Sequence, residues 1–157
     1  MLTFKNLTDA EVNKLTPLVA ASQSLANVVI VVEDVEDLTT EINKALGEIG
    51  MMIFIGTPDF ECAKSNLGQI TAAIVKQQIL IGEVPALWRL TAGAVHCQDA
   101  ARIVAAALQG LLLDNNQRLK VVSGFPLGTF KGDNKSTTAV FQYYKLELET
   151  NMTFAVN

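Results

Sequence analysis

The stretch DAARIVAAALQGLLL, residues 99–113, decides the fold. Its larger apolar residues recur at helical spacing, which predicts a helix that buries one face. Asp99 stands where an N-cap residue belongs, and we expect its carboxylate to accept from the first turn. Gly110 lies near the far end, and we expect the polar run 114–116 to stop the helix. Because many of its residues are alanine, a sheet can approach this helix closely.

Apolar runs rich in β-branched residues flank this helix on both sides. Residues 27–34 and 51–57 read as buried strands, and residues 119–126 as a further strand. Residues 139–149 alternate at their end, with Leu146 and Leu148 opposite three charged neighbours, which indicates a half-buried antiparallel strand. We expect residues 151–157 to extend that strand or to pair with a neighbour.

Residues 69–80 fit either a strand or a helix. Isoleucine, valine and threonine dominate the stretch, and β-branched side chains crowd a helix but suit a pleated surface. We therefore predict a long strand, with Gly82 and Pro85 marking a bulge and the strand end.

Two further helices are expected before the strands of the second half. Residues 8–23 open with Thr8 and Glu11 at capping-box spacing, and Pro17 should kink this helix or begin another. This helix belongs to an N-terminal extension over residues 1–26. A shorter helix follows over residues 37–46, with Gly47 or Gly50 as its stop. Residues 57–68, 85–98 and 128–138 read as loops.

The order of elements predicts the fold class. Runs of neighbouring strands with separate helices favour an α+β fold over a doubly wound sheet. We expect one domain over residues 1–157, with a mixed, mainly antiparallel sheet. One helix packs across this sheet, and one or two further helices complete the domain.

Composition excludes several classes of function. The 157 residues carry a net charge of −4, 50% are hydrophobic and only 18% are charged. There is no basic cluster, so sequence-specific nucleic-acid binding is not expected. No apolar run reaches the roughly eighteen residues of a membrane span. The N-terminal stretch does not read as a signal peptide, so we expect synthesis in the cytoplasm.

No catalytic or metal-binding constellation emerges. His96 and Cys97 are adjacent and would point apart on an extended chain, while Cys62 could supply a thiol instead. One histidine and two separated cysteines do not make a metal site, and no nucleotide-binding loop occurs. The acidic group over residues 33–37 reads as a solvated loop. We expect no cofactor, no metal and no enzymatic activity, with a small His/Cys enzyme as a remaining alternative.

Trp88 and Arg89 form the most distinctive pair, because these two residue types anchor interfaces. Trp88 could equally pack in the core of its own subunit. The candidates for subunit or partner contacts are Trp88, Arg89, Lys76, Lys131, Asp133 and Lys135.

The sequence resembles the tail-terminator, or tail-completion, proteins of long-tailed bacteriophages. The resemblance spans roughly residues 28–150. It is carried by the helix TTEINKAL before the strand MMIFIGTPDF, by the long segment IVKQQILIGEVP before the loop with Arg89, by the helix DAARIVAAALQG and by the closing strand VFQYYKLELET.

This resemblance implies a structural virion protein made in the host cytoplasm. Such a subunit assembles into a ring, a hexamer in that family, which caps the tail tube and joins it to the neck. The implied partners are other copies of the chain, the tail tube protein and a neck or head-completion protein. A heterologous ring would also cover exposed edge strands. The alternatives are another phage neck or tail-tube protein, a secretion-system tube relative, and a cytosolic α+β adaptor module.

Overall fold

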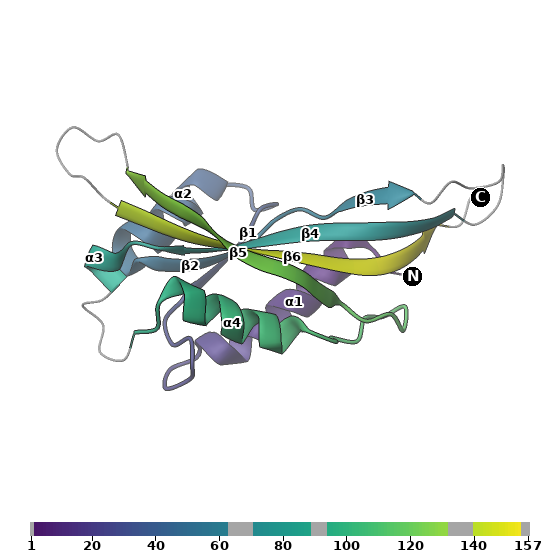
Figure 1. The fold of residues 1–157 in the computed structure, drawn as a ribbon, viewed down its shortest axis with the longest axis horizontal. Coiled ribbons are helices and arrows are strands. Elements are labelled where there is room, and N and C mark those ends of the chain that lie inside the picture. The colour runs from purple at the N-terminus through teal and green to yellow at the C-terminus, as the bar shows by residue number, and fades with distance from the viewer. Residues whose placement is uncertain (1, 63–70, 89–93, 132–139, 155–157) are drawn as a thin grey trace.

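The computed structural model describes residues 2–62, 71–88, 94–131 and 140–154. The helices are α1 (Phe4–Val19), α2 (Leu38–Lys44), α3 (Pro85–Trp88) and α4 (Cys97–Leu108), and the π-helical turn η1 (Ala45–Ile49) continues α2. The strands are β1 (Val29–Val32), β2 (Met51–Ile55), β3 (Asp59–Cys62), β4 (Thr71–Glu83), β5 (Lys120–Lys131) and β6 (Val140–Phe154). The order confirms the predicted α+β class (Figure 1).

The six strands form one sheet in the order β1-β2-β4-β6-β5, with β3 also pairing with β4. Only β1 and β2 run parallel among these pairs, and the other pairs are antiparallel. The sheet is therefore mixed and mainly antiparallel, as predicted. The strand β4 is its centre, because it pairs over its whole length with β6 and shares its other side between β2 and β3.

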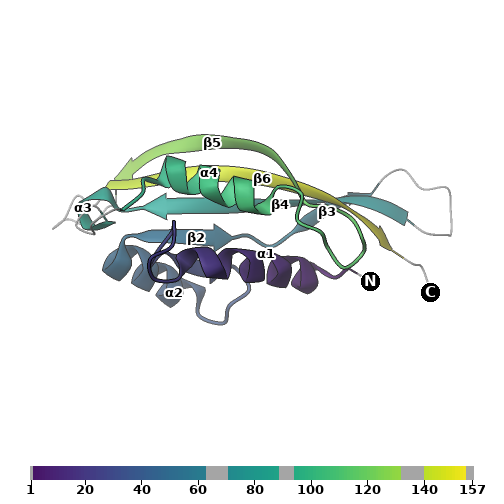
Figure 2. The ribbon, with the colours of Figure 1, turned by 90° about the horizontal axis from the view of Figure 1, so that it is seen from below.

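The helices α1 and α4 lie against the same face of the sheet (Figure 2). Alternate residues of β4 point into this main core, where Val75, Ile79 and Ile81 are buried. The helix α4 contributes its small residues Ala100 and Ala101, which are fully buried and permit close packing against the sheet. The predicted helix across the sheet is thus confirmed.

A second, smaller core lies on the opposite face. There α2 and η1 cover one end of the sheet, with Leu46, Met52 and Val84 buried together. Gly50 ends this helical segment in the left-handed region at φ 96°, and a Cβ there would lie 2.8 Å from the backbone nitrogen of Trp88. Glycine is required at this position for both reasons.

Both ends of α1 and both ends of α4 differ from the prediction. The helix α1 begins at Phe4, capped by the hydroxyl of Thr3, so the capping box of Thr8 and Glu11 is wrong. Pro17 lies inside α1 and does not start a second helix, because α1 ends at Val19, two residues later, and not at residue 23. The helix α4 begins at Cys97 and ends at Leu108, so the expected limits of 99 and 113 and the N-cap at Asp99 are wrong.

Three segments expected as loops carry regular structure. The strand β3 pairs with β4 from Asp59 to Cys62, and α3 is a single helical turn ending at Trp88. The strand β5 continues to Lys131, into the segment expected as a polar loop. The helical N-terminal segment is confirmed as helix, and Leu7 and Leu15 of α1 lie in the main core. The long strand over residues 69–80 is confirmed where described, from Thr71.

Candidate interaction surface

Trp88 is a core residue of its own subunit. Its side chain is 2% exposed, and its indole Nε1 donates a hydrogen bond of 2.8 Å to the backbone oxygen of Val95. Of the two alternatives for Trp88, the structure shows core packing in its own subunit, and a partner contact at this residue stays a prediction. Trp88 fixes the chain that leads from β4 into α4.

The other predicted contact residues are spread over the molecule. Lys76 is exposed on β4 and its Nζ lies 3.0 Å from Oε2 of Glu61 on β3. Lys131 is the last residue of β5. Arg89, Asp133 and Lys135 lie outside the described residues. The structure thus brings none of the described candidates together, and their role as partner contacts stays a prediction.

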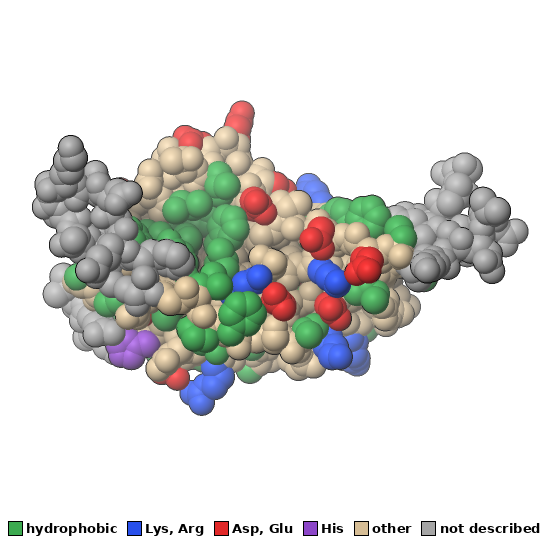
Figure 3. All heavy atoms as spheres, turned by 45° about the horizontal axis from the view of Figure 1, so that its top comes forward, with side chains coloured by type: hydrophobic (Ala, Val, Ile, Leu, Met, Phe, Trp, Pro, Cys, Tyr) green, Lys and Arg blue, Asp and Glu red, His purple; other side chains and the backbone are tan. Residues whose placement is uncertain are grey.

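The part of the sheet that α2 leaves uncovered is lined with charged side chains of both signs (Figure 3). On β6, the Nζ of Lys145 lies 3.1 Å from Oε1 of Glu147 and 5.4 Å from the ring centre of Phe125 on β5. Ser123 donates a hydrogen bond to Glu147, and this bond and Lys145 lower the pKa of that carboxyl. These contacts join the exposed side chains of β5 and β6.

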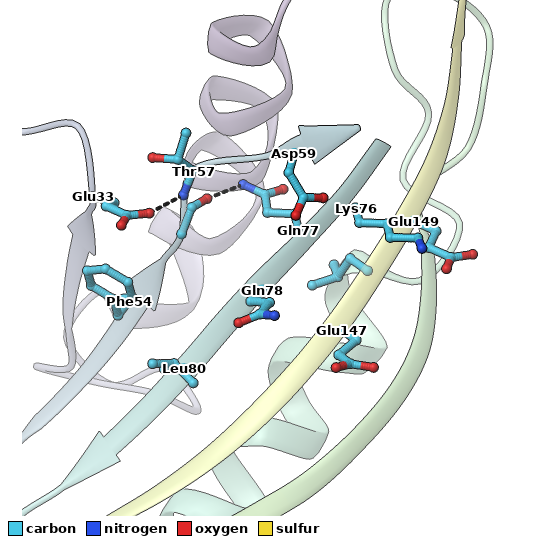
Figure 4. Close-up of a pocket in the computed structure, with 12 residues that line it drawn as sticks. Glu33, Phe54, Thr57, Asp59, Lys76, Gln77, Gln78, Leu80, Glu147 and Glu149 are labelled. Atoms are coloured by element: carbon cyan, nitrogen blue, oxygen red, sulfur yellow. Dashed lines mark hydrogen bonds between the residues drawn. The ribbon is translucent and has the colours of Figure 1, made fainter. Parts of the chain in front are cut away.

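A depression of about 460 Å³ lies on this face beside the ends of β1 and β2 (Figure 4). Phe54 and Leu80 line its apolar side. Its charged lining residues are four carboxylates and one lysine: Glu33, Asp59, Glu147, Glu149 and Lys76. The carboxylate of Glu33 accepts a hydrogen bond from the backbone N–H of Thr57, which joins the chain after β1 to the chain after β2.

The described residues contain no group of three or more His, Cys, Asp or Glu side chains placed to hold a metal ion. For the alternative of a His/Cys enzyme, no described contact joins the imidazole of His96 to the thiol of Cys97. The Nδ1 of His96 lies 3.5 Å from Oε1 of Glu83, not against Cys97. Burial, together with the nearby Glu83, raises the pKa of the Cys97 thiol to about 11. A thiol with that pKa is a poor nucleophile at neutral pH.

Glu83 is the residue that caps α4, and the sequence analysis missed it. Its side chain is fully buried, and its Oε2 accepts a hydrogen bond of 3.0 Å from the backbone N–H of Cys97, the first residue of the helix. A carboxylate at a helix N-terminus satisfies a free donor and meets the positive end of the helix dipole. The signal in the sequence was an acid within the apolar stretch ILIGEV.

Glu11 is a second buried carboxyl that the sequence analysis missed. It lies on α1, four residues after Leu7 and four residues before Leu15. The side chain of Glu11 is fully buried, as are the side chains of these two leucines. Neither of its oxygens makes a hydrogen bond of good geometry in the described structure, and the same is true of Oε1 of Gln77. Burial raises the pKa of Glu11 to about 8, and interaction with the Gln77 side chain offsets part of this rise.

Exposed apolar side chains gather on the edge strand β5. Val122, Phe125 and Leu127 are 45%, 37% and 39% exposed. In the sheet β5 pairs with β6 on one side, and no other described strand pairs with it. An edge strand with apolar side chains is a surface on which another chain can add. This edge is the strongest candidate for an interaction surface.

No known family model matches the sequence, and no curated protein matches it. Among solved structures, the fold is similar to a chain of the "Virion of native gene transfer agent (GTA) particle". The similarity has a TM-score of 0.52 at 16% identity and covers 96% of each chain. At this identity the likeness shows a shared fold over the whole length. No helix in the described part of the chain has the length and apolar character needed to cross a membrane.

Proposed function

We propose that this protein is a structural component of a phage-like virion. The observation that carries the proposal is the fold shared, over 96% of both chains, with a protein of a gene transfer agent virion. The resemblance of the sequence to phage tail terminators supports the same class by a separate route. A fold alone does not fix a function, so the two lines are used together.

Within the virion, we propose that the protein is the tail terminator. Copies form a ring that caps the tail tube, stops its growth and joins it to the neck. The resemblance in the order of elements supports this position, and the ring would cover the apolar edge at β5. Another neck or tail-tube position is the second candidate, since a fold shared with a virion protein is compatible with more than one place in the particle.

We also propose that the protein is not an enzyme. Two observations support this. The Cys97 thiol has a raised pKa and is buried, and His96 contacts Glu83 instead of a thiol. The variants His96→Ala and Cys97→Ser should therefore assemble as the natural protein does.

The test is to add the purified protein to tail tube protein that is polymerising and to measure tube length by electron microscopy. A terminator shortens the tubes and appears as a cap at one end, while a tube or neck protein leaves their length unchanged. Light scattering across a range of concentration and salt gives the assembly state, expected near six times 16.9 kDa alone or on tubes. A monomer that never binds tubes would instead favour the adaptor alternative.

A further inference from the structure

The strands β1 and β5 form the two outer edges of the sheet. Among the described strands, β1 pairs with β2 and β5 pairs with β6, and each has no strand on its other side. Val29, Ile30 and Val32 of β1 stay partly exposed, although α1 and α2 both contact this strand. The opposite edge carries the exposed apolar residues of β5. Both edges therefore offer apolar surface to another chain.

The registers of the strand pairs show which residues of β1 and β5 lie at the same height along the sheet. Following the pairs across β2, β4 and β6, Val31 is level with Phe125. In the same way Val32 is level with Gly124, and Val29 with Gly128. The whole of β1 thus lies level with the apolar part of β5. The strand β3 meets that height only at the start of β5, so it takes no part in a contact with these residues.

Strand directions and faces also agree between the two edges. The strand β1 is parallel to β2 and so antiparallel to β4, whereas β5 runs in the direction of β4 because both are antiparallel to β6. Val31 belongs to the second core, and Phe125 pairs with Lys145, which lies on the same face as Tyr143 of that core. A rotation about an axis roughly along the strands preserves direction, height and face. It therefore brings β5 of one copy antiparallel to β1 of the next, with Phe125 beside Val31.

Charges next to this apolar contact are complementary. Residues 33–37, directly after β1, contain four acids and no lysine or arginine, whereas residues 118–131 contain three basic residues and no acid. Glu33 extends β1 by one position, because its N–H donates a hydrogen bond of 3.0 Å to the backbone oxygen of Ile55, and it is therefore level with Ser123. Lys120 lies two positions further toward the acidic turn, about 7 Å along the strand. The basic start of β5 thus meets the acidic turn of the next copy.

Pro126 restricts the kind of contact that β5 can make. It carries no N–H, and β5 shifts register with β6 at Val121/Ser123 and at Pro126/Gly128. A continuous backbone ladder along this edge is therefore not expected. The contact depends on side chains, apolar beside β1 and charged beside residues 33–37.

We propose that copies of this chain join head to tail through these edges, with β5 of one copy beside β1 of the next. Phe125 and Leu127 then become covered, and Lys120 faces the acidic turn. This inference rests on the proposed function, because it names the subunit contact of the proposed ring.

Two pairs of cysteine substitutions at level positions test the contact. The first pair is Glu33→Cys with Ser123→Cys, and the second is Val31→Cys with Phe125→Cys, both in the Cys62→Ser background. The protein is oxidised with diamide, which takes up the two electrons and two protons of each new disulfide, and products are separated on a non-reducing gel. One chain cannot join its own two edges, because β2, β4 and β6 lie between them.

The matched control keeps the natural Cys62 and carries Phe125→Cys alone. Cys62 is the exposed last residue of β3 and is level with Met152, seven positions along β6 from the partner of Phe125. Seven positions span about 24 Å, which is too far for a disulfide between level copies.

We expect at least one cysteine pair to give covalent chains longer than a dimer, because each copy then carries one thiol on each edge, and we expect the control to give none. Pairs that assemble but never link would overturn the proposal. So would equal linking in the control, or a dimer formed by Phe125→Cys alone in the Cys62→Ser background, which would indicate an isologous contact through β5.

A second experiment tests the charges and needs no cysteine substitution. Lys120→Glu should raise the dissociation constant between copies about fivefold at low salt, and less at high salt. Asp34→Lys in the same chain should restore most of the lost affinity. Arg102→Glu, an equal charge change at a side chain of α4 that is 82% exposed, should leave the dissociation constant unchanged. Equal effects of Lys120→Glu and Arg102→Glu would contradict the edge contact.

The outcomes separate this inference from the proposed function. Natural protein of ring mass on tubes, with cysteine pairs that assemble but never link, overturns the edge contact and leaves the terminator proposal standing. Protein that stays a monomer with and without tubes overturns both.

Discussion

Two carboxyl groups are buried against the same face of the sheet, and their surroundings differ. Glu83, near the end of β4, meets a backbone N–H of α4 at 3.0 Å and a histidine at 3.5 Å. Glu11, on α1, meets the amide side chain of Gln77 and no donor of good geometry among the described residues. The difference shows two ways to keep a carboxyl in a core: supply donors from a helix terminus, or supply a proton.

The largest expected effect comes from titrating Glu11. Its pKa is raised to about 8 in the folded protein from 4.5, so the stability gained by its protonation is complete below pH 4.5. That stability is lost as pH rises toward 8, by on the order of 4 kcal/mol. Denaturant unfolding from pH 5 to 9 measures the loss. Glu11→Gln keeps the shape and cannot ionise, so its stability should lack this slope, and an unchanged slope would contradict the assignment.

The next effect concerns Glu83. Glu83→Ala removes the acceptor for the first N–H of α4 and opens a cavity, which should lower the free energy of unfolding by about 3 kcal/mol. Glu83→Gln keeps an oxygen at that place and should cost about half as much. Thermal unfolding of both variants checks this. If the two variants lose equally, the hydrogen bond to Cys97 is not the source of the effect.

A smaller effect is expected at His96. Its side chain is 48% exposed and only approaches Glu83 at 3.5 Å, so His96→Ala should lower the free energy of unfolding by about 0.5 kcal/mol or less. Urea-induced unfolding at pH 7 measures this loss. A loss as large as that of Glu83→Ala would mean that the histidine, rather than the helix, holds the buried carboxylate.

The smallest effect is expected for a carboxylate that water already solvates. Glu61 on β3 bonds to Lys76, and their side chains are 72% and 47% exposed. Lys76→Ala should shift the melting temperature by no more than about 1 °C. Differential scanning calorimetry with Lys14→Ala as an exposed control would reveal a larger role for this pair.

The longer strands and their order along the chain follow from the sequence, because the apolar run MMIFI and the alternation of leucine with charged residues in KLELE each carry a strand pattern. The N-terminus of α4 does not, since its cap comes from Glu83, fourteen residues upstream, and Asp99 offered a local substitute. The role of Glu11 was also predicted wrongly. Its spacing from Thr8 fits a capping box, but its spacing from Leu7 and Leu15 places it among the buried residues of α1. Long-range contacts decided both positions.

The candidate surface was harder to predict than the fold. The strand β3 has the short sequence DFEC, which contains two acidic residues. Its pairing with β4 is a tertiary contact that this sequence does not predict. For Trp88 the sequence left two interpretations open, a partner contact and packing in its own core. Its indole hydrogen bond to the backbone oxygen of Val95 depends on how the chain returns from β4 to α4. The exposed apolar residues of β5, Val122, Phe125 and Leu127, can be recognised as a candidate surface only once the strand order places β5 at an edge of the sheet.

The buried carboxyl of Glu11 also ties folding to the solvent through mass balance. Because the folded group keeps a proton at neutral pH that the unfolded group has released, each molecule takes up close to one proton as it folds at pH 7. The heat of folding must then include the ionisation heat of whatever buffer gives up that proton. Calorimetry in phosphate and in Tris should therefore report different enthalpies for the same transition, and Glu11→Gln should remove the difference.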